Sequence, residues 1–197
     1  MFQEAIKQIK TAATLLALMT ILTGLLYPAL VTGIAQLFFP WQANGSLIQD
    51  KSAAIGSVLI GQYFDSPKYF WGRPSATSPF PYNAANSSGS NMGPSNTDFL
   101  ATVNQRAIHL RSTNSPNNAL VPVDLVTASG SGLDPEISPL AALYQTARIA
   151  KARSIPEQEV KALVNKLQKN RTFHLLGEPR INVLELNLAL DQIQPNP

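Results

Sequence analysis

Residues 12–31 read AATLLALMTILTGLLYPALV and contain no charged side chain. About 20 apolar residues, each rising about 1.5 Å along a helix, span the roughly 30 Å hydrocarbon core of a bilayer. The uncharged stretch extends from Thr11 to Gln49, whereas the rest of the chain mixes charged, polar and apolar residues as a globular domain does. The sequence therefore predicts one transmembrane helix that anchors a separate soluble domain.

The residues that flank this stretch predict its orientation. Lys7 and Lys10 precede it, and Phe38, Phe39 and Trp41 follow it. Basic residues favour the cytoplasmic side of a membrane, and aromatic residues gather at its interfaces. We therefore expect a cytoplasmic N-terminus at 1–10, a transmembrane helix at 11–33, an interfacial segment and connector at 34–52, and an extracytoplasmic soluble domain at 53–197.

A cleaved signal peptide is the alternative to an anchor, because Gly33-Ile34-Ala35 resembles a small-x-small cleavage site. The apolar stretch is longer than the core of a signal peptide, about 7–15 residues, and more apolar and aromatic residues follow it. We therefore favour an uncleaved anchor.

Four residues of the anchor recur at every fourth position: Thr20, Gly24, Pro28 and Thr32. Small faces let the backbones of membrane helices approach closely, so this pattern favours packing against another membrane helix. Glycine and proline are also commoner in transmembrane helices than in soluble ones. The spacing alone leaves both explanations open.

The soluble part predicts a mixed α/β (α+β) domain. We expect strands at 55–60 and 121–127, and helices that begin at Ser95, Ser138 and Pro156. Residues 181–190 alternate like a strand, but Asn182 and Glu185 form a helix-start pair, which favours a helix. The apolar periodicity predicts these buried faces: Leu100, Val103, Ala107 and Leu110 on the first helix, Leu140, Leu143, Ala147 and Ala150 on the second, and Val160, Leu163, Val164 and Leu167 on the third.

The composition excludes several classes of function. The net charge of +3 is small and dispersed, which argues against nucleic-acid binding. Without cysteine there is no thiolate nucleophile, disulfide or cysteine-based zinc site. No G-x-S-x-G or S-x-x-K motif occurs, and Gln62 replaces the phosphate-binding lysine after Gly56–Gly61. His109 and His174 have no second ligand at metal spacing, so we expect no catalytic residue and no metal site.

Two features remain as candidates for binding. Asp124 and Asp134 flank a Ser/Gly turn and are the best carboxylate pair, although capping and turn stabilisation are the favoured roles for both. Five aromatic residues lie between Tyr63 and Trp71, and such a run forms either core or a binding surface.

Several stretches, in this order and spacing, resemble the KdpC family, the C subunits of the Kdp potassium-transporting P-type ATPase complex. They are TGLLYP at 23–28, GSVLIGQYF at 56–64, YFWGRPSA at 69–76, SGSNMGPSN at 88–96, VPVDLVTASGSGLDP at 121–135 and INVLELNLALD at 181–191. The resemblance runs from the anchor almost to the C-terminus.

The resemblance implies a non-catalytic accessory subunit of an ATP-driven, high-affinity potassium importer in the bacterial plasma (inner) membrane. The implied partners are a channel-like potassium-translocating subunit, a P-type ATP-hydrolysing subunit, a small single-span subunit and membrane lipid, with no nucleic acid. ATP, through the partner subunit, and K+ are ligands of the complex, and no cofactor is assigned to this chain. The alternative is a stand-alone membrane-anchored extracytoplasmic binding or hydrolytic domain.

The family is described as a catalytic chaperone that raises the ATP affinity of the hydrolysing subunit through an ABC-signature-like stretch with a glutamine. The corresponding nucleotide candidates here are Ser87, Ser88, Gly89, Ser90 and Asn91, and the stretch has no glutamine. This departure, and the expected extracytoplasmic position, argue for an allosteric effect. The loops 81–96 and 127–134, with Asp124 and Asp134, are the candidates for contact with potassium on its path. The favoured alternative is that these loops dock against loops of a partner subunit.

Overall fold

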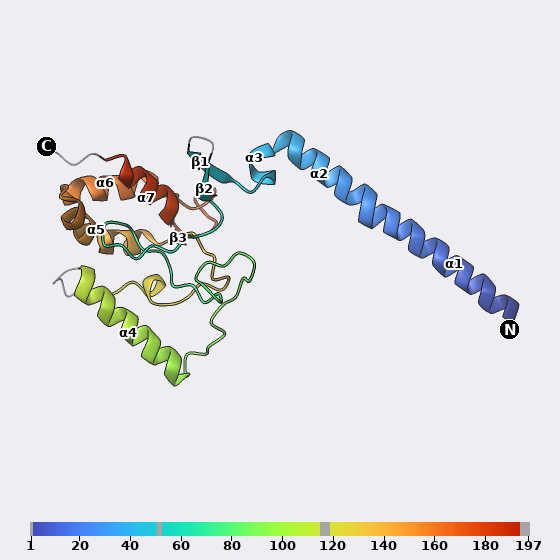
Figure 1. Ribbon diagram of the computed structural model, residues 1–197, viewed down its shortest axis with the longest axis horizontal. Coiled ribbons are helices and arrows are strands. Elements are labelled where there is room, and N and C mark those ends of the chain that lie inside the picture. Colours follow the sequence, from blue (N-terminus) through green and yellow to red (C-terminus); the bar gives the residue numbers. More distant parts are fainter. Residues whose placement is uncertain (1, 51–52, 115–118, 194–197) are drawn as a thin grey trace. The chain divides into compact units, whose positions relative to one another are not determined.

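The computed structural model describes residues 2–50, 53–114 and 119–193 (Figure 1). The chain divides into two compact units, Met1–Leu47 and Ile48–Pro197, which we describe separately. The first is helical and apolar, and the second combines helices with short strands. The predicted fold class, a mixed α/β domain behind one N-terminal apolar helix, is confirmed.

The first unit is built on one long helix. It comprises α1 (Phe2–Ile21), the π-helical turn η1 (Leu22–Leu26) and α2 (Tyr27–Phe38), followed by the short α3 (Pro40–Ala43). Phe2–Phe38 is long and apolar enough to cross a membrane, and none of its side chains is buried within the chain. The apolar side chains are therefore available to lipid or to other membrane helices.

Pro28 explains the wide turn in the middle of this helix. Proline has no N–H to donate to the carbonyl four residues earlier, here that of Gly24, and its ring clashes with that carbonyl in a regular α-helix. The Tyr27 N–H instead donates to the Leu22 carbonyl, five residues back. Local π-helical turns of this kind accommodate proline in membrane helices.

The wide turn also affects the small residues of the anchor. In a regular α-helix each fourth residue drifts by roughly 40° around the axis, so four of them spread over roughly 120°. The η1 turn lies between Thr20 and Pro28 and contains more residues per turn, which reduces this drift. Thr20, Gly24, Pro28 and Thr32 therefore form a narrower stripe than α-helical geometry alone would give.

The second unit is mainly helical. In Figure 1, α5 packs against α4 and α6, and α6 packs against α7. Short antiparallel strands, β3 and β4, pair Glu136 with Asn182 and Ile137 with Ile181. The element bounds are β1 Leu47–Asp50, β2 Ala53–Ser57, α4 Thr97–Asn114, η2 Val123–Leu125, β3 Glu136–Ile137, α5 Pro139–Arg153, α6 Glu157–Leu167, β4 Ile181–Asn182 and α7 Val183–Asp191.

Local sequence signals correctly place three helices. The Ser138 side chain accepts a hydrogen bond from the Ala141 N–H and begins α5. The Asn182 side chain accepts one from the Glu185 N–H and begins α7, which confirms a helix over most of 181–190. The predicted stripe of α6 is confirmed, with Val160 and Val164 fully buried and Leu163 and Leu167 packed against the core.

The core of the second unit encloses an extended segment, Phe70–Trp71, that belongs to no sheet. The buried Asn187 side chain donates to the Phe70 carbonyl (3.0 Å) and accepts from the Phe70 N–H (2.8 Å). Gln145 makes the same pair of bonds with Trp71, at 3.1 and 2.8 Å. Two amide side chains thus take the place of a neighbouring strand and satisfy buried backbone groups.

Arg148 extends this arrangement to the preceding turn. Its guanidinium donates to the Asn114 side chain (2.7 Å), the Gln145 side chain (2.7 Å) and the Pro67 carbonyl (2.8 Å). It also lies 3.9 Å above the centre of the Trp71 ring. Burial lowers the pKa of Arg148 to about 10, so the group stays protonated at neutral pH.

The predicted start and face of the first soluble helix are partly wrong. The α4 helix begins at Thr97, and Asn96, not Ser95, accepts the capping bond from the Phe99 N–H at 2.9 Å. Leu110 is buried, but Leu100 is exposed. Among the described elements, α4 packs chiefly against α5, and Leu100 near its N-terminus stays outside the core.

The predicted face of α5 is also partly wrong: Ala150 is buried in the core and Ala147 is half-buried, as expected. Leu140 and Leu143 are exposed, whereas Gln145, Thr146 and Arg148 are buried. Gln145 and Arg148 face inward because they bind backbone groups of Trp71 and Pro67, whereas Thr146 bonds to the Glu157 carboxylate of α6.

Both predicted strands need correction. Residues 121–127 form the single 3-10 turn η2 with flanking coil, and the Val126 carbonyl accepts from Arg106 rather than from a neighbouring strand. The strand predicted at 55–60 is β2, which ends at Ser57 and leaves Ile55 exposed.

We predict that Asn187→Ala destabilises the second unit by about 2–4 kcal/mol, because it leaves the Phe70 N–H and carbonyl buried without partners. Asn165→Ala, at an exposed position of α6, is the control and is expected to change stability by less than about 0.5 kcal/mol. Denaturant unfolding of the full chain, followed by Trp71 fluorescence in a Trp41→Phe background, measures both. Equal stability of the two variants would contradict the role of the amide pair.

Candidate functional site

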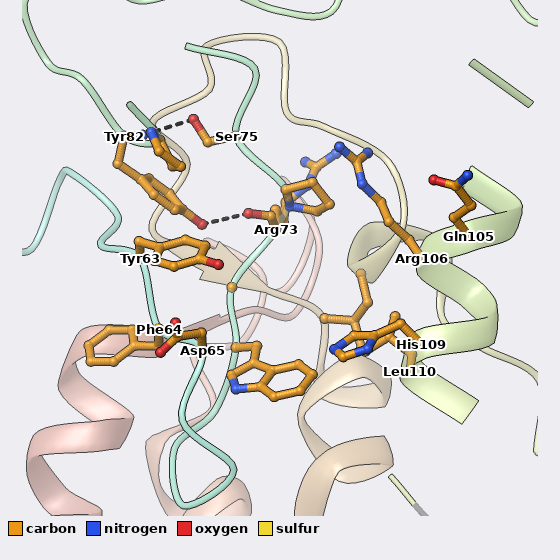
Figure 2. A pocket seen from close by; sticks show the side chains of 15 residues that line it. Tyr63, Phe64, Asp65, Arg73, Ser75, Tyr82, Gln105, Arg106, His109 and Leu110 are labelled. Carbon is orange, nitrogen blue, oxygen red and sulfur yellow. Dashed lines mark hydrogen bonds between the residues drawn. The ribbon is translucent and has the colours of Figure 1, made fainter. Parts of the chain in front are cut away.

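A pocket of about 510 Å³ opens between α4 and the loop that follows Gln62. Figure 2 shows Gln105, Arg106 and His109 extending from α4 on one side, with Tyr63 and Tyr82 on the other. The walls are mostly aromatic and apolar. Such a lining with a few polar groups is typical of binding sites.

Trp71 lies in the wall of the pocket, where its ring contacts His109 and Arg148. Its ring stacks on His109 with centroids 5.6 Å apart and an interplanar angle of 10°. Arg148 covers it at 3.9 Å. Because its backbone is held by Gln145, Trp71 is fixed in position and links the pocket to the core.

Tyr82 and Arg73 form the opposite wall. The Tyr82 hydroxyl donates to the Arg73 carbonyl at 2.6 Å (Figure 2). The Arg73 guanidinium binds the Asp134 carboxylate at 3.1 Å. Burial, and secondly the Asp134 charge, raise the pKa of Tyr82 to about 12, although Arg73 acts in the other direction. The phenol is therefore neutral and serves as a structural donor.

The polar groups of the pocket suit binding better than catalysis. The Ser75 hydroxyl donates to the Gly132 carbonyl (2.7 Å) and accepts from the Tyr82 N–H (2.9 Å), so its bonds are structural. Arg106 donates one bond, to the Val126 carbonyl at 3.0 Å, and burial lowers its pKa. The rest of its guanidinium lies on the pocket, where it suits an acceptor group.

The structure places the predicted nucleotide stretch, residues 87–91, against a second Ser/Gly loop, residues 129–132. Ser87 Oγ donates to the Ser131 carbonyl at 3.0 Å, and the Ser88 N–H donates to the same carbonyl at 2.9 Å. Gly132 has a φ of +68°, and a Cβ there would lie 2.5 Å from the Ser88 carbonyl oxygen, so only glycine fits. A Cβ on Gly89 would lie 2.9 Å from the Gly130 carbonyl oxygen, whereas Ser90 and Asn91 lie further along the same loop.

The two candidate carboxylates have separate structural partners. Asp124 accepts from the Ser138 N–H (2.8 Å) at the start of α5. Asp134 binds Arg73 and also accepts from the Glu136 N–H (2.9 Å). A role of either group in the potassium path stays a prediction, as does a role of residues 87–91 in nucleotide binding.

The sequence reading missed most of the pocket. Arg106, His109 and Leu110 share a helix face at spacings of three and four, which is the signal that could have grouped them. The aromatic run contributes both to the core and to a possible binding surface: Phe70 is fully buried, and Tyr63 is exposed on the pocket. Among the residues that the structure describes, no group of three His, Asp or Glu side chains is arranged to hold a metal ion.

We predict that the stabilising effect of Tyr82 depends on pH. Its pKa is about 12 in the folded chain against 10.0 for a free phenol, so the contribution is fully present below pH 10 and is lost as the pH rises to about 12. The difference in unfolding free energy between the native chain and Tyr82→Phe should shrink over this range. Denaturant unfolding at a series of pH values measures it, with Tyr63→Phe as the exposed control. A difference that does not change with pH would contradict the prediction.

Comparison with known proteins assigns the chain to a family. The family model described as "KdpC: K+-transporting ATPase, c chain" matches residues 9–192. The chain is 55% identical over 189 residues to the potassium-transporting ATPase KdpC subunit of Methylococcus capsulatus, covering 96% of this chain and all of the relative. It is 55% identical to the corresponding subunit of Herpetosiphon aurantiacus (94% and 96% covered) and 56% identical to that of Variovorax paradoxus (93% and 95% covered).

The match includes both the apolar helix and the soluble domain, in agreement with the resemblance seen in the sequence. The chain therefore belongs to the KdpC family, the c chain of K+-transporting ATPases.

Proposed function

We propose that this chain is a non-catalytic accessory subunit that assembles and couples an ATP-driven potassium import complex in the bacterial inner membrane. The observation that carries the proposal is the family match, which extends over residues 9–192 and thus over anchor and domain alike. The partners we propose are a channel-like subunit that carries the ion, a P-type subunit that hydrolyses ATP, and a small single-span subunit.

The anchor supports a role in assembly. Its side chains are exposed along the whole helix, and the stripe of Thr20, Gly24, Pro28 and Thr32 offers a place for close helix packing. A Cβ at Gly24 would meet nothing nearer than the Thr20 side chain at 3.9 Å. The fold of this chain does not itself require glycine there, so a neighbouring subunit is the more direct reason for the small residue.

The proposed orientation separates the soluble domain from ATP. Lys7 and Lys10 favour a cytoplasmic N-terminus, which puts the second unit outside the cytoplasm. Moreover, the Ser87 hydroxyl and the Ser88 N–H already bind the Ser131 carbonyl. We therefore propose that any effect on ATP affinity is allosteric and passes through the membrane helices, with a coupling free energy of about 1–3 kcal/mol.

A stand-alone anchored binding or hydrolytic domain is the competing proposal. The pocket beside Trp71 is the feature that favours it, since its lining suits a bound group. Such a protein would be stable and active without partners, whereas an accessory subunit should co-purify with large multi-span proteins.

We predict that Asn165→Cys, on the exposed side of α6, reacts with a membrane-impermeant maleimide in intact cells. The chain has no native cysteine, so the label reports this position alone. Gln3→Cys, at the other end of the anchor, is the matched control and should react only after lysis. The reverse pattern would overturn the proposed orientation and make direct ATP contact possible again.

We predict that Gly24→Leu reduces co-purification of the partner subunits by about tenfold, because a large side chain prevents close helix packing. Gly33→Leu is the matched control. A Cβ there also meets open space, but Gly33 lies roughly 140° around the helix from Pro28. Quantitative affinity purification of the tagged chain measures both variants. Equal recovery of partners would remove the stripe from the assembly interface.

A further inference from the structure

A small hairpin between α6 and β4 ends in an apolar tip. Its stem is held by backbone bonds between Lys169 and Arg180 (2.8 and 2.9 Å) and between Thr172 and Leu176 (2.8 and 2.9 Å). We call residues 173–176, Phe-His-Leu-Leu, the tip. Phe173 and His174 have positive φ values of 54° and 61°, a conformation that non-glycine residues rarely adopt.

The tip exposes large apolar side chains. Phe173 is 86% exposed, Leu175 is 75% exposed and Leu176 is 58% exposed. Apolar residues grouped on a projecting turn mark a surface that is covered in the working protein.

The charges of the stem are balanced. Arg171 contacts both carboxylate oxygens of Glu178 at 2.7 Å. Lys169 pairs with Glu185 at 2.7 Å, and Arg180 pairs with Glu136 at 2.9 Å. The charged side chains of the stem are therefore all in ion pairs. The tip can approach an apolar medium without carrying an unpaired charge into it.

The C-terminal end of the hairpin lies close to the segment that follows β2. Beyond Arg180, the Asn182 side chain donates to the Val58 carbonyl at 2.8 Å, just after β2. In Figure 1 β2 lies beside α7, and a Cβ on Gly56 would come within 2.9 Å of the Leu184 side chain. The end of the stem and the segment around the end of β2 are thus in contact.

Chain connectivity then keeps the domain at the bilayer. The Trp41 indole, of the aromatic group that follows the apolar span, donates to the Leu47 carbonyl at 3.1 Å. The second unit begins at the next residue, Ile48. A tethered group has a high effective concentration at its target, so even weak insertion is enough to occupy the membrane surface.

We propose that the tip, residues 173–176, is a membrane-contact site that inserts its apolar side chains into the interface of the bilayer that the same chain spans. The contact is apolar and depends little on lipid charge, because the stem carries balanced ion pairs. It holds the soluble domain at the membrane surface at a second point in addition to the anchor. The proposal rests on the membrane span and the tip, and it holds for either orientation of the anchor.

The test uses the full-length chain in phosphatidylcholine nanodiscs, with His174→Cys carrying an environment-sensitive fluorophore. We expect blue-shifted emission and quenching by nitroxide-labelled lipid, both unchanged by high salt or by added anionic lipid. Asn165→Cys on α6 should show aqueous emission and no lipid quenching. Because His174 has a positive φ, Asn170→Cys in the stem provides a second label, for which we expect quenching by headgroup nitroxides.

A matched pair of double variants tests the side chains themselves. Phe173→Ser with Leu175→Ser should lower the ratio of inserted to non-inserted Asn170→Cys label by about tenfold or more, the value of one buried aromatic side chain. Val123→Ser with Leu140→Ser removes side chains that are 69% and 66% exposed elsewhere on the domain, and it should leave the label inserted.

Three outcomes would overturn the proposal. Aqueous emission from both tip labels would show that the tip stays in solvent. Quenching that requires anionic lipid and disappears in salt would replace apolar insertion with electrostatic binding. A blue shift that appears only in the assembled complex, without lipid quenching, would place the tip against a partner subunit.

Discussion

The second unit depends on how the Phe70–Trp71 backbone is buried. An extended segment in a core must satisfy its N–H and carbonyl groups, and here no neighbouring strand does so. Asn187 from α7 and Gln145 from α5 supply these bonds instead. The two helices and the segment are consequently tied into one body, and the fully buried Phe70 side chain fills the space between them.

The pocket follows from this arrangement. Since the Trp71 backbone is fixed, its ring presents one surface to Arg148 and stacks on His109 of α4. The wall formed by Arg73 and Tyr82 is tied in turn to the second Ser/Gly loop through Asp134 and Gly132. The loops that the sequence marks as candidates for contact with partners are therefore ordered by the same core that holds the helices.

The sequence predicted the elements whose signals are local. The apolar stripe of α6 and the cap at Asn182 need only neighbouring residues to be read. Prediction from the sequence failed where contacts between residues far apart in the chain determine which side chains are buried. Gln145 and Arg148 face inward because backbone groups 74 and 81 positions away in the chain need an acceptor and a donor, and the general preference of polar residues for the surface hides this. The pocket was missed for the same reason, since Trp71 and His109 meet only in the folded chain.

The wide turn at Pro28 has a consequence for how the anchor transmits rotation. A π-helical turn holds one residue more than an α-helical turn, which amounts to roughly 100° of helical phase. Because proline can never donate the missing bond to Gly24, this offset is built into the chain and does not relax. The residues of α2 are thereby rotated relative to those of α1 in the direction that offsets the drift of every fourth residue. One continuous helix can in this way keep a single face toward a neighbouring helix on both sides of its proline.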